Sequence, residues 1–150
     1  QKPMWDKVKE TILYLKSKGL RVDGIGWQGH LKLSKTTANF IEKTDQALME
    51  LSDLIDWAHA NDLDFHITEL DYKIADKSNL LKEFQTQAII YQKIVNVLQS
   101  KVNSGVVTLN LWDMGERFKK PDIYFQSIYD SNFEPTPAYS IIKKALTNNQ

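Results

Sequence analysis

The sequence predicts an α/β protein built on parallel strands. Three short segments rich in strand-forming residues alternate with four stretches of helical periodicity, beginning and ending with a helix. This alternation is typical of βαβ units, in which a helix joins each strand to a parallel neighbour. The middle strand, 63–70, is apolar and then turns acidic at Glu69 and Asp71. In parallel α/β sheets the functional groups gather at the carboxyl ends of strands, so these two residues indicate where a site lies.

Composition excludes several classes of protein. The chain has 150 residues, of which 42% are hydrophobic, enough for one domain over residues 1–150 with its own core. Lysine plus arginine and aspartate plus glutamate number 19 each, without the basic excess of a nucleic-acid binder. Without cysteine there are neither disulfides nor thiolate zinc sites. No apolar run approaches the length of a membrane span. We therefore expect no membrane contact, and the balanced charge predicts no nucleic-acid partner. We also expect no cofactor.

Four helices are predicted from apolar residues that recur at helical spacing. The first covers 4–18 and ends at Gly19, the second covers 44–60 and ends at Asn61-Asp62, and the third runs from Leu80 to Val102. A last helix opens after Pro135 and Pro137. His59, at the polar end of the second helix, is expected to be a surface residue.

The first strand, 21–31, contains three glycines, which weaken a strand unless something approaches its backbone closely. Alternation places Gly24, Gly26, Gln28 and His30 on one face. Small residues followed by polar ones on the same face suit a crowded barrel interior that opens into a polar mouth.

Alternation along the second predicted strand assigns different residues to its two faces. Strict alternation assigns Phe65, Ile67, Glu69 and Asp71 to one face and His66, Thr68 and Leu70 to the other. The spacing of His66 and Glu69 resembles that of metal ligands, but strict alternation puts them on opposite faces, so no metal site is expected.

The three strand ends carry complementary chemistry if the strands are parallel. They offer Gln28 with His30, then Glu69 with Asp71, then Trp112 and the nearby loop acid Glu116. A carboxylate can attack an anomeric carbon, polar groups can hold ring hydroxyls, and an aromatic face can stack on a pyranose. The combination favours carbohydrate processing.

Three segments resemble glycoside hydrolase family ten, whose members are retaining endo-1,4-β-xylanases on a (β/α)8 barrel. They are 23–31 (DGIGWQGHL), 67–71 (ITELD) and 133–139 (FEPTPAY), in the order and spacing of the last three barrel strands and the closing helix. The resemblance covers essentially the whole chain and predicts a fold consisting of strands six to eight of the TIM barrel, incomplete without an N-terminal half.

The resemblance implies a role for each matched residue. Glu69 matches the nucleophile on the seventh strand, and His30 matches the histidine that hydrogen-bonds it. Asp71 matches the acid that orients this histidine. Gln28 matches a ligand of the sugar beside the scissile bond, and Trp112 matches the tryptophan beneath that sugar.

The departures from the family pattern define what the chain lacks. Strands one to five are absent, and with them the Asn-Glu pair that carries the acid/base glutamate. Asp113 stands where a glycine is expected, and Phe118 is the nearest aromatic to the position of a second tryptophan. Three strands would leave open edges and an exposed apolar face. We therefore expect the missing half to come from the same or another chain, and little activity from these residues alone.

Three functions remain open at this stage. The chain is the nucleophile half of an enzyme that hydrolyses internal β-1,4-xylosidic bonds in xylan or xylo-oligosaccharides, or a non-catalytic β-glycan-binding remnant, or part of a (β/α)8 glycosidase for another β-glycan. The resemblance implies a secreted or periplasmic protein, although no signal peptide is visible.

Overall fold

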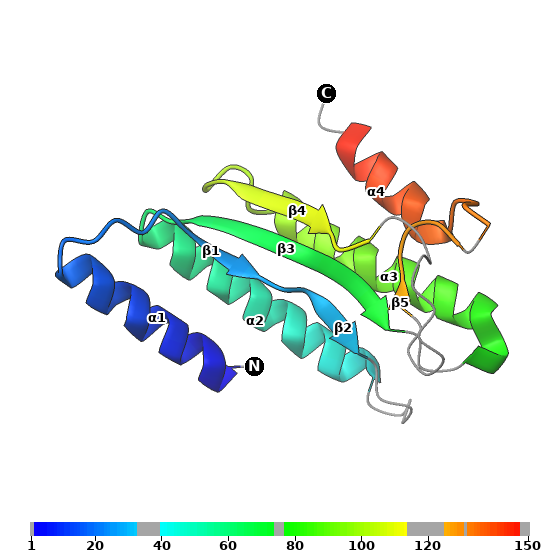
Figure 1. Ribbon diagram of the computed structural model, residues 1–150, viewed down its shortest axis with the longest axis horizontal. Coiled ribbons are helices and arrows are strands. Elements are labelled where there is room, and N and C mark those ends of the chain that lie inside the picture. Colours follow the sequence, from blue (N-terminus) through cyan, green and yellow to red (C-terminus); the bar gives the residue numbers. More distant parts are fainter. Residues whose placement is uncertain (1, 33–39, 74–76, 114–124, 131, 148–150) are drawn as a thin grey trace.

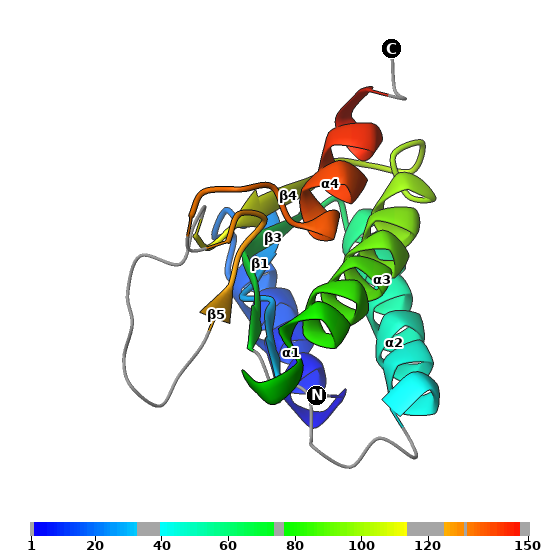
Figure 2. The ribbon, with the colours of Figure 1, turned by 90° about the vertical axis from the view of Figure 1, so that its right-hand side faces the viewer.

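The computed structural model describes residues 2–32, 40–73, 77–113, 125–130 and 132–147. One layer of strands is covered on one face by helices, with α2 and α3 behind the sheet, α1 beside α2, and α4 against α3 (Figures 1 and 2). The helices are α1 (Lys2–Ser17), α2 (Phe40–Ala60), α3 (Leu80–Gln99) and α4 (Pro137–Thr147), with a 3-10 turn at Lys77–Asn79. The strands are β1 (Gly24–Trp27), β2 (His30–Lys32), β3 (Asp64–Lys73), β4 (Val107–Leu111) and β5 (Phe125–Gln126). The predicted α/β order is confirmed.

Strand β3 is the centre of the sheet. It pairs in parallel with β1, β2 and β4, and its last residues pair antiparallel with β5. Strands β1 and β2 lie along one side of β3 and β4 along the other (Figure 1). The expected single strand 21–31 is therefore two short strands, interrupted at Gln28 and Gly29. The parallel order brings the carboxyl ends of β1, β3 and β4 to one edge, as a parallel α/β sheet requires.

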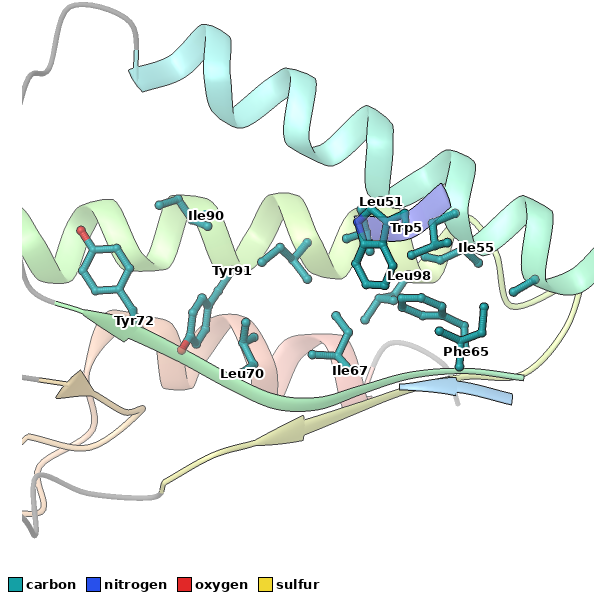
Figure 3. Close-up of a cluster of buried hydrophobic side chains, with 14 of the residues drawn as sticks. Trp5, Leu51, Ile55, Phe65, Ile67, Leu70, Tyr72, Ile90, Tyr91 and Leu98 are labelled. Atoms are coloured by element: carbon teal, nitrogen blue, oxygen red, sulfur yellow. The ribbon is translucent and has the colours of Figure 1, made fainter. Parts of the chain in front are cut away.

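The core lies between β3 and the helices. The β3 side chains that face the helices are almost completely buried, at 0% to 1% exposure, and pack with residues of α1, α2 and α3 (Figure 3). They are Phe65, Ile67, Leu70 and Tyr72. Burying a large apolar side chain contributes about 1.5–3 kcal/mol, so this face supplies much of the stability.

A β-bulge in β3 changes which residues share a face. On one side, Trp27 pairs with Ile67 and His30 pairs with Asp71. Between these pairs the chain advances three residues from Trp27 to His30 but four residues along β3. On the other side, β4 shows the same register shift between Ile67 and Leu70. One extra residue in β3 reverses the alternation, because two residues then oppose one on the neighbour.

The expectation of strict alternation is therefore wrong. Phe65 and Ile67 face the helices before the bulge, and Leu70 and Tyr72 face them after it. Glu69 consequently lies on the face opposite to Phe65 and Ile67, not on theirs. Bulges occur often beside active sites, where they re-aim one side chain, and here that side chain is Glu69.

The sheet face turned away from the helices is polar, which corrects the expectation of an exposed apolar face. His66 Nδ1 lies 2.9 Å from the hydroxyl of Thr108 on β4, and Asn110 is exposed. A Cβ added to Gly26 would come within 3.1 Å of the Thr68 methyl group, so this face is also crowded, as the glycine pattern predicted.

Helices α1 and α2 end in the same way with different residues. Gly19 has φ +72°, and Leu20 N–H donates to the Leu15 carbonyl. In α2 the equivalent left-handed position is Asp62, at φ 57°, and Leu63 N–H donates to the Ala58 carbonyl. Both are Schellman endings, and aspartate is one of the few non-glycine residues that adopt this conformation. Both predicted helix ends are confirmed.

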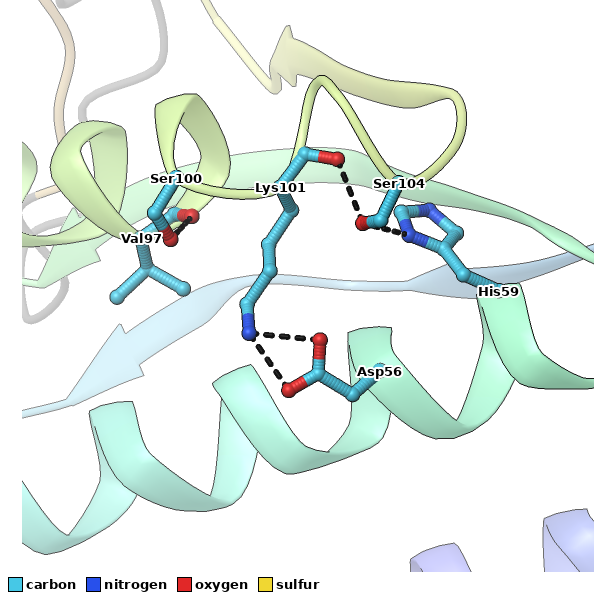
Figure 4. A network of polar contacts seen from close by, with 6 residues as sticks. All are labelled: Asp56, His59, Val97, Ser100, Lys101 and Ser104. Carbon is cyan, nitrogen blue, oxygen red and sulfur yellow. Dashed lines mark hydrogen bonds and ion pairs between the residues drawn. The ribbon is translucent and has the colours of Figure 1, made fainter.

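His59 ties the end of α2 to the turn between α3 and β4 (Figure 4). Its Nδ1 lies 2.8 Å from Ser104 Oγ, and its Nε2 lies 3.1 Å from the Val106 carbonyl oxygen. The Lys101 ammonium group binds both carboxylate oxygens of Asp56 at 2.6 and 2.7 Å. The expectation of a simple surface histidine is therefore wrong, because both ring nitrogens have partners that belong to another element.

Candidate active site

The carboxyl ends of β1, β2 and β3 bring three predicted site residues into contact. Glu69 accepts a hydrogen bond from Gln28 Nε2 at 2.9 Å through Oε1, and its Oε2 lies 3.2 Å from His30 Nε2. The interruption of the first strand places Gln28 and His30 opposite the bulge that carries Glu69. Neither contact would form if Glu69 pointed toward the helices, so the bulge and the strand break together assemble the cluster.

His30 lies between two carboxylates. Its Nδ1 is 2.9 Å from Asp71 Oδ2 while its Nε2 faces Glu69, and His30 pairs with Asp71 in the β2–β3 register. A carboxylate is an acceptor only, so two ionised partners require a proton on both ring nitrogens. The ring thus links Glu69 to Asp71, although these two side chains are not bonded to each other.

The three groups differ in their contact with solvent. The side chain of His30 is 42% exposed, that of Glu69 19% and that of Asp71 4%. Burial raises the pKa of Asp71 above its ordinary value, the hydrogen bond and charge of His30 lower it, and the charge of Glu69 raises it. Glu69 can therefore meet a ligand from solvent, whereas Asp71 can act only through His30.

Trp112 supplies an exposed aromatic surface beside His30. Its backbone N–H donates to the Leu70 carbonyl at 3.0 Å, which extends the β3–β4 pairing past the end of β4. The Trp112 and His30 rings are perpendicular, with centroids 5.8 Å apart, and Trp112 remains 58% exposed. An exposed indole next to a carboxylate is a suitable stacking surface for an apolar sugar face.

Two expectations lie beyond the reach of the structure. Glu116 and Phe118 fall outside the described residues.

Within the described ranges, no group of three or more histidine, aspartate or glutamate side chains is arranged to hold a metal ion. The described helices also include none that is both long and apolar enough to cross a membrane.

Sequence reasoning missed a buried residue behind this cluster. Tyr91, on α3, is completely buried, and its position on an apolar helical stripe made it look like ordinary core. Its hydroxyl group is the only sign in the sequence of another role, because a buried tyrosine hydroxyl usually has a hydrogen-bond partner.

Parallel strands with crossover helices, and carboxylates at their carboxyl ends, are the arrangement found in part of a barrel-type α/β protein with its site at the carboxyl edge. The chain belongs to glycosyl hydrolase family 10, whose model matches residues 2–145. It is 24% identical over 144 residues to endo-1,4-beta-xylanase B of Thermotoga neapolitana, covering 93% of this chain and 38% of that protein.

Solved structures show the same fold and the same partial coverage. An endo-1,4-beta-xylanase of Penicillium canescens superposes with a TM-score of 0.73 at 20% identity, covering 94% of this chain and 41% of that one. Xylanase 10B of Thermotoga petrophila, solved in complex with xylobiose, gives a TM-score of 0.65 at 25% identity, covering 95% and 41%. The chain thus has the fold of part of a (β/α)8 barrel and spans about two fifths of these relatives, as expected for a C-terminal fragment.

Proposed function

We propose that this chain supplies the nucleophile half of a retaining endo-1,4-β-xylanase. The observation that carries the proposal is the double contact of Glu69, a hydrogen bond from Gln28 at 2.9 Å and an ion-pair contact with His30 at 3.2 Å, at the carboxyl edge of a parallel sheet. Catalytic residues of (β/α)8 enzymes come from this edge. Membership of glycosyl hydrolase family 10 supports the same reaction class.

In the proposed reaction Glu69 attacks the anomeric carbon while the glycosidic bond breaks and the leaving oxygen takes a proton from the acid/base carboxyl group. The covalent glycosyl-enzyme is then hydrolysed by a water molecule that gives its proton back to the same group. Donors on both carboxylate oxygens aim the nucleophile and stabilise its charged form. Gln28, which holds Glu69, is the proposed partner of a hydroxyl group on the bound sugar. Trp112, exposed beside His30, is the proposed platform under that sugar.

Retaining hydrolysis also needs an acid/base carboxyl group roughly 5–5.5 Å from the nucleophile. Asp71 is unsuited to this role, because its side chain is 4% exposed and engaged by His30 Nδ1. We propose that the acid comes from the barrel half that the relatives possess and this chain does not span. The 150 residues alone would then bind xylo-oligosaccharides weakly and cleave them little. Because a polysaccharide cannot cross a membrane, we also propose that the protein acts outside the cytoplasm.

The test measures xylan hydrolysis by the full natural polypeptide that carries these residues, whatever its length. Incubation with a 2-deoxy-2-fluoro xylobioside should trap a covalent adduct on Glu69, detectable by peptide mass spectrometry. Glu69→Gln should abolish both the adduct and turnover. Glu134→Gln, at an exposed position that contacts none of the cluster side chains, is the matched control and should retain both.

Each other outcome identifies a different function. Xylan binding without cleavage in the full polypeptide would indicate a non-catalytic binding protein. Cleavage of β-glucans with little activity on xylan would indicate a glycosidase of another specificity. Turnover by the 150 residues alone that is lost in Glu69→Gln would show that no second half is required.

A further inference from the structure

Two buried polar atoms near the cluster lack hydrogen bonds within the described part of the chain. Asp71 is 3% exposed, and only its Oδ2 is engaged, by His30, whereas Oδ1 has no partner. The Tyr91 hydroxyl oxygen is buried and equally without a partner. A buried polar group without a hydrogen bond costs about 1–3 kcal/mol. One of these atoms is an acceptor and the other carries a donor, so each can satisfy the other.

The two groups lie close enough for the charge of Asp71 to act on Tyr91, although their oxygens are not hydrogen-bonded in the structure. Figure 3 shows the Tyr91 hydroxyl directed at β3 between Leu70 and Tyr72, where Asp71 is the intervening residue. Burial raises the pKa of Tyr91, the neighbouring Gln87 side chain lowers it, and the negative charge of Asp71 raises it. Tyr91 therefore remains protonated, and its hydroxyl proton faces an anionic acceptor.

Gln87 holds the tyrosine from the other side. It lies one turn before Tyr91 on α3, and its Nε2 donates to the Ser127 carbonyl at 3.2 Å. When the amide also donates to the Tyr91 oxygen, the hydroxyl proton of Tyr91 is left for another acceptor. The polar chain then runs from Ser127 through Gln87 and Tyr91 to Asp71.

We propose that Tyr91 is a positioning residue whose hydroxyl donates to Asp71 Oδ1 and so holds Oδ2 against His30 Nδ1. Through His30, this contact fixes the orientation of Glu69. Tyr91 touches neither substrate nor nucleophile. It acts on Glu69 only through Asp71 and His30. Its importance for catalysis rests on the proposed function, whereas the hydrogen bond to Asp71 does not.

The experiment follows the titration of the Asp71 carboxyl by carbon-13 NMR in the full natural polypeptide, with the signal identified by its loss in Asp71→Asn. Tyr91→Phe removes one hydroxyl and should raise the titration midpoint of Asp71 by roughly one pH unit, because a donor to the ionised carboxylate is lost. Tyr72→Phe is the matched control. Tyr72 is also fully buried, but its hydroxyl donates to Glu83 at 2.9 Å, so the Asp71 midpoint should stay in place.

An unchanged midpoint in Tyr91→Phe, or an equal shift in Tyr72→Phe, would overturn the proposal. If Tyr91→Phe does not fold, site-specific 3,5-difluorotyrosine at position 91 decides, since a stronger donor should lower the midpoint and no movement rejects the contact. Xylan hydrolysis is recorded in parallel, where Tyr91→Phe should lower kcat more than it changes KM. A shifted midpoint in a protein without xylanase activity would leave the hydrogen bond standing and reject the proposed function.

Discussion

Two histidines at opposite ends of the sheet each have both ring nitrogens engaged, but by different kinds of partner. His59, near the amino ends of β3 and β4, binds the Ser104 hydroxyl and the Val106 carbonyl. His30, at the carboxyl ends, lies between the carboxylates of Glu69 and Asp71. The partners of His59 are neutral and those of His30 can ionise. In (β/α)8 proteins the amino end of the barrel serves stability and the carboxyl end serves chemistry, and the two histidines follow that division.

The largest effect should follow from His30→Ala. This variant removes a hydrogen bond to Asp71 and an ion-pair contact with Glu69. Polar contacts to charged groups are worth about 1.5–3 kcal/mol each, so kcat/KM on xylo-oligosaccharides should fall by about a hundredfold or more. The free energy of unfolding should fall by only about 1–3 kcal/mol, because the buried Asp71 carboxyl group loses its partner whereas His30 itself is 42% exposed and outside the core. Steady-state kinetics and urea unfolding of the full polypeptide measure both quantities. A large loss of stability with normal kcat/KM would mean that His30, like His59, serves stability and not catalysis.

The opposite result is expected at the other end of the sheet. A Cβ at position 105 would lie 2.5 Å from His59 Cδ2, so Gly105→Ala should lower the free energy of unfolding by about 1–3 kcal/mol without changing kcat/KM of the folded protein. His59→Ala should cost a similar amount, since two hydrogen bonds are lost.

The double variant Gly105→Ala with His59→Ala serves as the control. Its loss of stability should be smaller than the sum of the single losses, because the added methyl group no longer meets the ring. If urea unfolding shows that the two single losses in the free energy of unfolding add strictly, the close approach of Gly105 and His59 does not explain why residue 105 is glycine.

Asp71 should give stability a pH dependence that no partner of His59 shares. Its folded pKa is raised above the ordinary value of 3.8, mainly by burial, so the folded state holds its proton to higher pH than the unfolded chain. The free energy of unfolding should therefore decrease as pH rises through the interval between these two pKa values. Asp71→Asn should remove this component, and urea unfolding at a series of pH values should show a flatter profile. An identical profile in the variant would contradict the assignment.

The smallest effect should come from the ion pair beside His59. Lys101 binds Asp56 with both carboxylate oxygens, but the Asp56 side chain is 55% exposed, so Lys101→Met should cost less than about 1 kcal/mol. The difference from wild type should shrink in high salt, because exposed ion pairs are screened. Urea unfolding at low and high salt tests this, and a loss that is independent of salt would indicate that packing of the Lys101 stem is responsible.

Local patterns predicted the elements well, because helix ends and strand composition depend on nearby residues. Gly19 and Asp62 end their helices where the sequence indicated. Pairing of Gln28, His30, Glu69 and Asp71 was likewise anticipated from polar residues at the ends of parallel strands and from the resemblance to family ten. His59 was misjudged, because its two partners lie more than forty residues away in the sequence.

By itself the sequence determined the alternation of helices and strands, the central position of the acidic strand, and the family to which it belongs. Only the tertiary structure decided the face on which Glu69 lies. A bulge adds one residue to β3 relative to both neighbouring strands, and its position depends on register, which no single strand encodes. The contact of His59 with the turn before β4 and the burial of Tyr91 behind Asp71 were decided in the same way. Both depend on the packing of helices against a sheet that is assembled from distant parts of the chain.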